Sequence, residues 1–145
     1  MTERMSNKPT RWFWILAIAA LVWNLLGVMA YVMQVSMTEE ALALLPEDQR
    51  VLYETVPAWA TAAFAIAVFA GAVGCIALLL RKSWATPLFV LSLAGVLVQM
   101  FHSFFLSDAL EVYGASGMAM PILVLVIAVC LVGFSRSAAA RGWLT

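Results

Sequence analysis

The chain has 145 residues, of which 65% are hydrophobic and only 11% are charged. Soluble globular domains carry about 25% charged residues, so this composition excludes a soluble protein and indicates a single membrane domain. The formal net charge is zero, and the positions of the charges along the chain are therefore more informative than their sum.

Four long intervals of the chain contain no Asp, Glu, Lys or Arg. They cover residues 12–38, 55–80, 83–107 and 112–135, which is 27, 26, 25 and 24 residues. One helix needs roughly 20 apolar residues to cross the hydrocarbon core, and a spanning strand would alternate polar and apolar residues, which these intervals do not. We predict an all-α integral membrane four-helix bundle, with residues 1–145 forming one domain and helices over 12–35, 57–80, 84–106 and 117–135.

The basic residues collect on one side of the predicted membrane. Seven of the eight, all except Arg50, flank the start of the first helix, the turn between the second and third helices, or the end of the fourth. Short basic loops stay in the cytoplasm, so both termini are predicted to be cytoplasmic. The loop over 36–56 then faces the opposite compartment, together with most of the acidic residues.

The loop over 36–56 is the longest polar stretch between predicted helices. Thr38 can cap a short helix that opens with Glu39 and Glu40, and Pro46 suits the first position of a second one. The leucines between them would need an apolar surface to pack against, so we predict an ordered helical lid on the outer surface. Two roles fit such an element: a lid over a pocket, or a cap that only seals the bundle.

Small residues line one face of the second predicted helix. Ala63, Ala67 and Gly71 recur every four residues, a spacing that lets helix backbones approach closely within a membrane. We expect this face to pack inside the bundle or against another subunit. The fourth predicted helix has almost no polar side chain, so we expect a wide arc of it to face lipid.

A shift of 68 residues aligns the first predicted helix with the third. The 22 positions from Leu21 to Leu42 then contain six identities, among them Gly27 with Gly95. A repeat with two helices per unit would make the bundle two helical hairpins that are inserted the same way up.

Polar residues form one stripe on each of these two helices. At about 100° per residue the first stripe occupies a narrow arc, and the second lies at matching angles on the third helix. Polar side chains avoid lipid, so we expect both stripes to face inward and towards each other. The predicted ligand-binding residues are Asn24, Tyr31, Gln34, Gln99 and His102, and the glycines predicted to pack these helices closely are Gly27 and Gly95.

Three roles fit this pair of stripes. The side chains could hydrogen-bond the two helices to each other, surround a small neutral ligand with donors and acceptors, or couple to protons through His102, the only histidine of the chain. One histidine and two separated cysteines, Cys75 and Cys130, give no metal-ligand set, and no catalytic motif or paired acid and base occurs in the helices. We therefore expect no cofactor, no metal and no enzymatic activity.

A resemblance to a known group rests on three stretches of the chain: "WNLLGVMAYVMQ", "ALALLPEDQRVLYETVPAWATAAFAIAVFAGAVGC" and "LSLAGVLVQMFHSFFLSDALEVYG". They resemble small four-helix proteins of the bacterial inner membrane, which usually carry the label "sugar transporter" or no functional label. The resemblance covers roughly residues 12–143. It implies a multi-pass protein of the inner (cell) membrane and a sugar-like solute.

These patterns favour a small inner-membrane protein that binds, and by extension transports, a small polar or amphiphilic solute between the first and third helices. The alternative is an accessory or structural subunit that packs against a larger membrane complex through the small face of the second helix. Four helices make a thin wall for a transport path, so the partners expected besides lipid and solute are further copies of the chain or such a complex. Loops this short offer no surface for nucleic acid.

Overall fold

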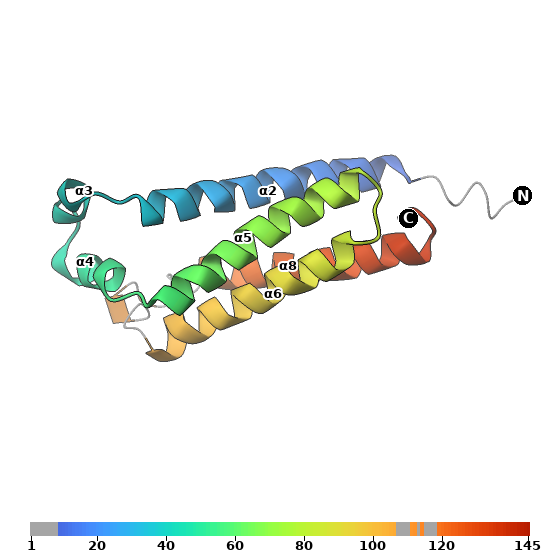
Figure 1. The fold of residues 1–145 in the computed structure, drawn as a ribbon. Helices are drawn as coiled ribbons and strands as arrows, with labels where there is room; N and C mark the ends of the chain where they lie inside the picture. The colour runs from blue at the N-terminus through green and yellow to red at the C-terminus, as the bar shows by residue number, and fades with distance from the viewer. Residues whose placement is uncertain (1–8, 107–110, 113, 115–118) are drawn as a thin grey trace, which may run out of the picture.

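The computed structural model describes residues 9–106, 111–112, 114 and 119–145, and this part of the chain contains helices and no strand. Four helices are long and apolar enough to cross a membrane, which confirms the predicted all-α four-helix bundle (Figure 1). The elements in chain order are α2 (Arg11–Val35), α3 (Glu39–Ala43), α4 (Glu47–Glu54), α5 (Ala58–Leu79), α6 (Ala85–Phe101), the π-helix η1 (His102–Leu106) and α8 (Ala119–Ala140).

Local sequence accounts for where the first helices begin. α2 begins after Thr10, whose hydroxyl accepts a hydrogen bond from the backbone N–H of Phe13 at 3.4 Å. Thr38 caps α3 as predicted and accepts from the N–H of Ala41 at 3.1 Å. Pro46 lies one position earlier than predicted, at the N-cap of α4.

Two predicted helices differ from the structure at their C-terminal ends. α8 continues to Ala140, although its apolar interval ends at 135, because a charge marks the membrane boundary and not the helix end, and Ala138 to Ala140 are strong helix formers. The third predicted helix changes from α to π winding at His102, where the backbone bonds span five residues and not four. The predicted start of the last helix, at 117, lies outside the described residues.

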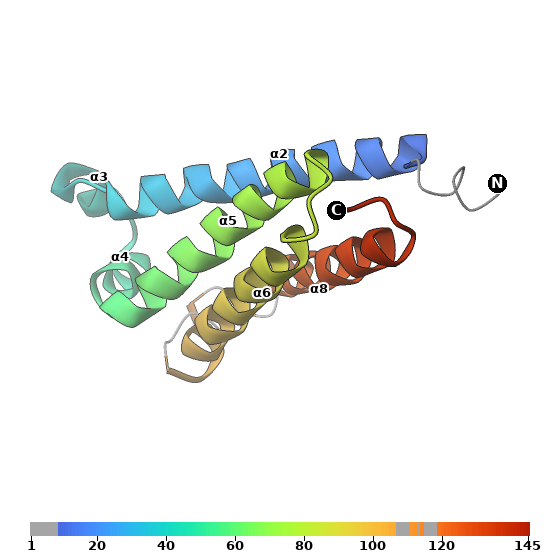
Figure 2. The same cartoon turned by 45° about the vertical axis from the view of Figure 1, so that its right-hand side comes forward.

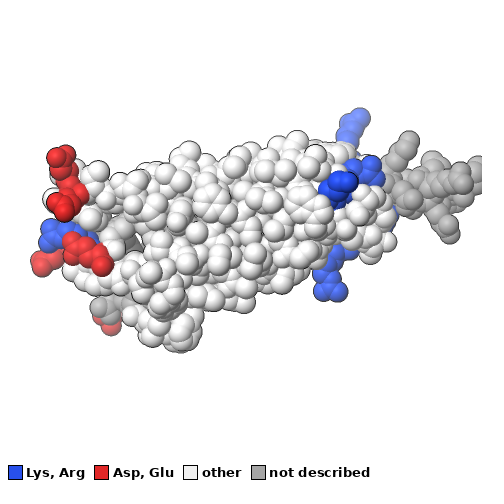
Figure 3. All heavy atoms as spheres, viewed as in Figure 1, with Lys and Arg blue, Asp and Glu red and all other residues white. Residues whose placement is uncertain are grey.

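The charged side chains gather at opposite ends of the bundle (Figure 3). One end, here called the acidic end, carries α3 and α4, and there Arg50 pairs with Glu54 at 3.9 Å. The other end, here called the basic end, holds the start of α2, the turn between α5 and α6 and the end of α8. The described charges of the basic end are Arg11, Arg81, Lys82, Arg136 and Arg141.

α5 is the central helix of the bundle. It packs along α6 and α2, and α6 in turn packs on α8 (Figure 2). More than half of the residues in the most apolar stretch of α5 are buried, whereas less than a quarter are buried in the corresponding stretch of each of the other three long helices. The many alanines and glycines of α5 allow two neighbours to approach it closely.

The largest buried cluster closes the basic end. Phe13 of α2 is fully buried there, and its ring centroid lies 5.7 Å from those of Phe134 of α8 and Trp143. The C-terminal residues fold back onto the turn between α5 and α6, where Arg81 Nε donates to the Trp143 carbonyl at 2.8 Å. The N–H of Thr145 donates to the Arg81 carbonyl at 2.8 Å. α2 and α8 are thus joined at this end through aromatic rings.

Candidate functional site

The polar stripe of α2 meets α5 at Asn24. The Asn24 side-chain amide donates to the Ala20 carbonyl, one turn earlier, at 2.8 Å and to the Cys75 sulfur of α5 at 3.5 Å. Its carbonyl oxygen Oδ1 lies so close to Gly71 that a Cβ at that position would overlap it. The glycine is therefore what lets an amide side chain lie against the face of α5.

The polar stripe of α6 meets α5 at Ser92. This buried serine donates its hydroxyl to the Ala67 carbonyl of α5 at 2.6 Å. One turn later, Gly95 lies on the backbone of Ala63 and Ala67. The Ser92 hydroxyl also comes within 3.2 Å of the Cβ position of Gly71, so Asn24 and Ser92, which the 68-residue shift aligns, approach the same glycine.

Both stripes thus face inward, as predicted, and they approach each other at the small residues of α5. Gly27 of α2 contacts Val68 of α5 just as Gly95 of α6 contacts Ala67. The physical reason lies in the small side chains of α5, which make it the helix that two neighbours can approach most closely, so it lies between them.

Three of the five predicted ligand-binding residues, Tyr31, Gln34 and His102, have surroundings other than the cavity described next. Tyr31 packs edge-on against Phe64 and Phe69 of α5, with ring centroids 5.5 and 5.6 Å apart. His102 packs edge-on against Trp59, with ring centroids 5.4 Å apart. Gln34 is half-buried near the acidic end of α2. None of these three lines the cavity described next.

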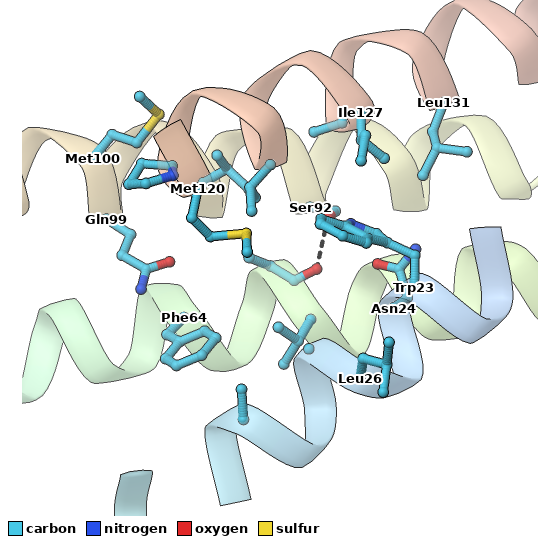
Figure 4. A pocket seen from close by; sticks show the side chains of 18 of the residues that line it. Trp23, Asn24, Leu26, Phe64, Ser92, Gln99, Met100, Met120, Ile127 and Leu131 are labelled. Atoms are coloured by element: carbon cyan, nitrogen blue, oxygen red, sulfur yellow. Dashed lines mark hydrogen bonds between the residues drawn. The ribbon is translucent and has the colours of Figure 1, made fainter. Parts of the chain in front are cut away.

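A cavity of about 440 Å³ lies between α2 and α8, over α5 and α6 (Figure 4). Asn24 and Gln99 are the two predicted ligand-binding residues that line it. Its other polar groups are Ser92, Ser103 and the indole of Trp23. The remaining lining is apolar and comes from all four long helices: Leu26, Gly27, Ala30, Phe64, Ala67, Val68, Val96, Met100, Met120, Pro121, Val124, Ile127, Ala128 and Leu131.

The polar groups of the cavity differ in whether they already form hydrogen bonds with protein atoms. The Ser92 hydroxyl and the Asn24 N–H groups already donate to protein atoms. The side-chain amide of Gln99 has no hydrogen-bond partner in the described part of the chain, and it projects from α6 into the space above Phe64 in Figure 4. No charged residue is among the described lining residues. The cavity therefore offers an uncharged amide to a guest inside an apolar wall.

The sequence interpretation missed the contribution of α8. Met120, Val124, Ile127 and Leu131 recur at spacings of four, three and four residues and face the cavity, a spacing that places them on one face of a helix. This spacing can be read from the sequence, but the other faces of the same helix are equally apolar. The sequence therefore does not show which face lines a cavity. The loop over 36–56 lines no part of the cavity, so α3 and α4 do not act as its lid, and Leu44 there is 87% exposed.

Comparisons of the chain with protein-family models, with curated proteins and with solved structures give no match.

Proposed function

We propose that this protein is a small multi-pass membrane protein that binds a small amphiphilic solute in the cavity between α2 and α8. The observation that carries the proposal is the unpartnered Gln99 amide inside a cavity of about 440 Å³ with apolar walls. Ligand sites are typically about 300–1,000 Å³ in volume, mostly apolar, and equipped with a few polar groups that fix orientation. This cavity has all three properties.

An amphiphilic solute fits the cavity better than a sugar does. A monosaccharide carries a hydroxyl on most of its carbons, and each one buried without a partner costs binding free energy. The lining offers five polar side chains, and two of them, Asn24 and Ser92, already donate to protein atoms. We therefore favour the amphiphilic member of the expected solute class, and transport of such a solute would be an extension of binding that needs further copies of the chain to complete a path.

The alternative function is that of an accessory subunit in a larger complex. It assumed that the small residues of the second predicted helix are available to a partner. Ala63, Ala67 and Gly71 are buried within the chain by α2 and α6. A larger partner would have to dock on another face. Co-purification of a stoichiometric partner would favour this alternative over solute binding.

The proposal includes an orientation in a bacterial inner membrane. The basic end would lie in the cytoplasm, following the positive-inside rule, and the acidic end with α3 and α4 would face outward. The start of α2 and the C-terminal residue Thr145 both lie at the basic end (Figure 1), so both termini would be cytoplasmic.

Native mass spectrometry of protein extracted into a mild detergent tests the proposal. We expect a mass excess from a retained small molecule, and we expect Gln99→Leu to weaken its retention about threefold to tenfold, the effect of losing one neutral hydrogen bond. Gln34→Leu is the matched control, because Gln34 lies on α2 outside the cavity, and it should retain the molecule normally. Equal retention by both variants, or no retained molecule at all, would count against binding in this cavity.

A further inference from the structure

We infer that the occupant of the cavity is an uncharged, lipid-soluble molecule with a hydroxyl or carbonyl group, and that it enters sideways from the bilayer between α2 and α8. This inference rests on the proposed function and specifies both the chemical class and the route.

The route follows from which lining residues are exposed. Leu26 of α2 is 55% exposed and Met120 of α8 is 59% exposed, and Ala30 of α2 is exposed as well, although all three line the cavity. These residues therefore form its rim, on the lateral surface of the bundle. α2 and α8 are joined by the ring contact between Phe13 and Phe134 at the basic end. Further along, the cavity lies between them, so its rim faces lipid.

The depth of Asn24 and Gln99 in the membrane indicates that the guest is uncharged. Asn24 lies 13 residues after the start of α2 and 11 before its end (24 − 11 and 35 − 24). Gln99 lies 14 residues into the span Ala85–Leu106 and seven before its end (99 − 85 and 106 − 99). Both positions are within hydrocarbon depth, where a charged group is costly, and no described lining residue carries a charge that could pair with one. A carboxylate, a phosphate or a zwitterionic headgroup is therefore excluded from this depth.

The remaining chemistry is that of a single neutral polar group on an apolar body. The Gln99 amide can donate two hydrogen bonds and accept others, and Asn24 Oδ1 can accept. A hydroxyl can bind either group, and a carbonyl can accept from Gln99. The apolar body would lie along Val124, Ile127 and Leu131 of α8. Long-chain alcohols and polycyclic alcohols share this chemistry.

Photolabelling in lipid bilayers tests the class of the guest. The probe is undecanol carrying a diazirine in its chain, and the labelled residues are mapped by peptide mass spectrometry. We expect saturable labelling of the cavity-lining residues of α2 and α8, with plain undecanol competing at least about tenfold better than ionised undecanoate. Equal competition by the carboxylate would overturn the uncharged class, and labelling that is scattered over lipid-facing residues without saturation would overturn the inference as a whole.

A pair of tryptophan substitutions tests the route. Ala30→Trp places a large ring at the rim without entering the buried core and should lower the rate of cavity labelling at least about fivefold. Ala19→Trp is the matched control, since Ala19 is an exposed alanine of α2 that does not line the cavity, and it should label at the normal rate. Thermal melts of both variants confirm that they are folded, and an unchanged rate in folded Ala30→Trp would overturn entry at this rim.

The two proposals can fail separately. If native mass spectrometry finds a polar solute whose retention depends on Gln99 while undecanol does not label the cavity, binding stands and the lipid-soluble class is wrong. If there is neither a retained molecule nor cavity labelling, both are wrong.

Discussion

Glycine at position 95 sets the distance between α5 and α6. A Cβ there would lie 2.7 Å from the carbonyl oxygen of Ala63 and 2.9 Å from the backbone nitrogen of Ala67. Both are backbone atoms that cannot rotate away as a side chain can, so an added methyl group must push the helices apart. Gly133 of α8, by contrast, has no atom within 4 Å of its Cβ position.

We expect Gly95→Ala to lower the free energy of unfolding by about 1–3 kcal/mol, the usual cost of overpacking. Gly133→Ala is the matched control and should leave stability unchanged or raise it by up to about 1 kcal/mol, since alanine favours helix over glycine. Unfolding in mixed detergent with increasing dodecyl sulfate, followed by circular dichroism, measures both. Similar midpoints for the two variants would show that the close approach at Gly95 does not limit packing.

At the scale of helices, α5 is held from two sides by polar side chains that use its small residues. Asn24 of α2 lies against Gly71, and Ser92 of α6 binds the Ala67 carbonyl. The seam that holds α2 to α5 therefore depends on the fit of one amide against one glycine. This dependence can be measured as a coupling between the two positions.

Gly71→Ala should destabilise the protein by about 1–3 kcal/mol, because the new methyl group overlaps Asn24 Oδ1 and forces the amide off its partners. In an Asn24→Ala background the overlapping atom is gone, so the same change should cost at least about 1 kcal/mol less. The four proteins of this cycle are compared by the same detergent titration. Strictly additive effects would mean that Asn24 and Gly71 do not touch in the membrane.

Sequence patterns predicted the helices because charge-free intervals report directly on hydrocarbon depth. They did not predict which helix lies between which, because periodicity places residues around one helix axis and says nothing about its neighbours. Gln99 lines the cavity, whereas His102 packs against Trp59 outside it, a difference that the angle around one helix axis does not show. The contribution of α8 to the cavity could not be predicted, because all faces of this helix are apolar and none stands out in the sequence.

For the whole molecule, the separation of acidic and basic ends makes the proposed orientation directly testable. Leu44 at the acidic end and Ala139 at the basic end are both exposed. We expect a membrane-impermeant maleimide to label Leu44→Cys on intact bacterial cells and to label Ala139→Cys only after permeabilisation. The unmodified chain gives the background from Cys75 and Cys130, which lie within the spans. The reverse pattern of labelling would invert the proposed topology.

The same distribution of charge bears on how an electric field acts on the protein. The four intervals between the charge clusters hold no Asp, Glu, Lys or Arg, so the part of the molecule at hydrocarbon depth carries no fixed charge from these residues. Carrying one elementary charge across a membrane involves about 2.3 kcal/mol per 100 mV, whereas a neutral guest moving within an uncharged interior transfers none. Occupancy of the cavity should therefore be the same in polarised and depolarised membranes, and net movement of the guest would follow its own concentration gradient and not the voltage.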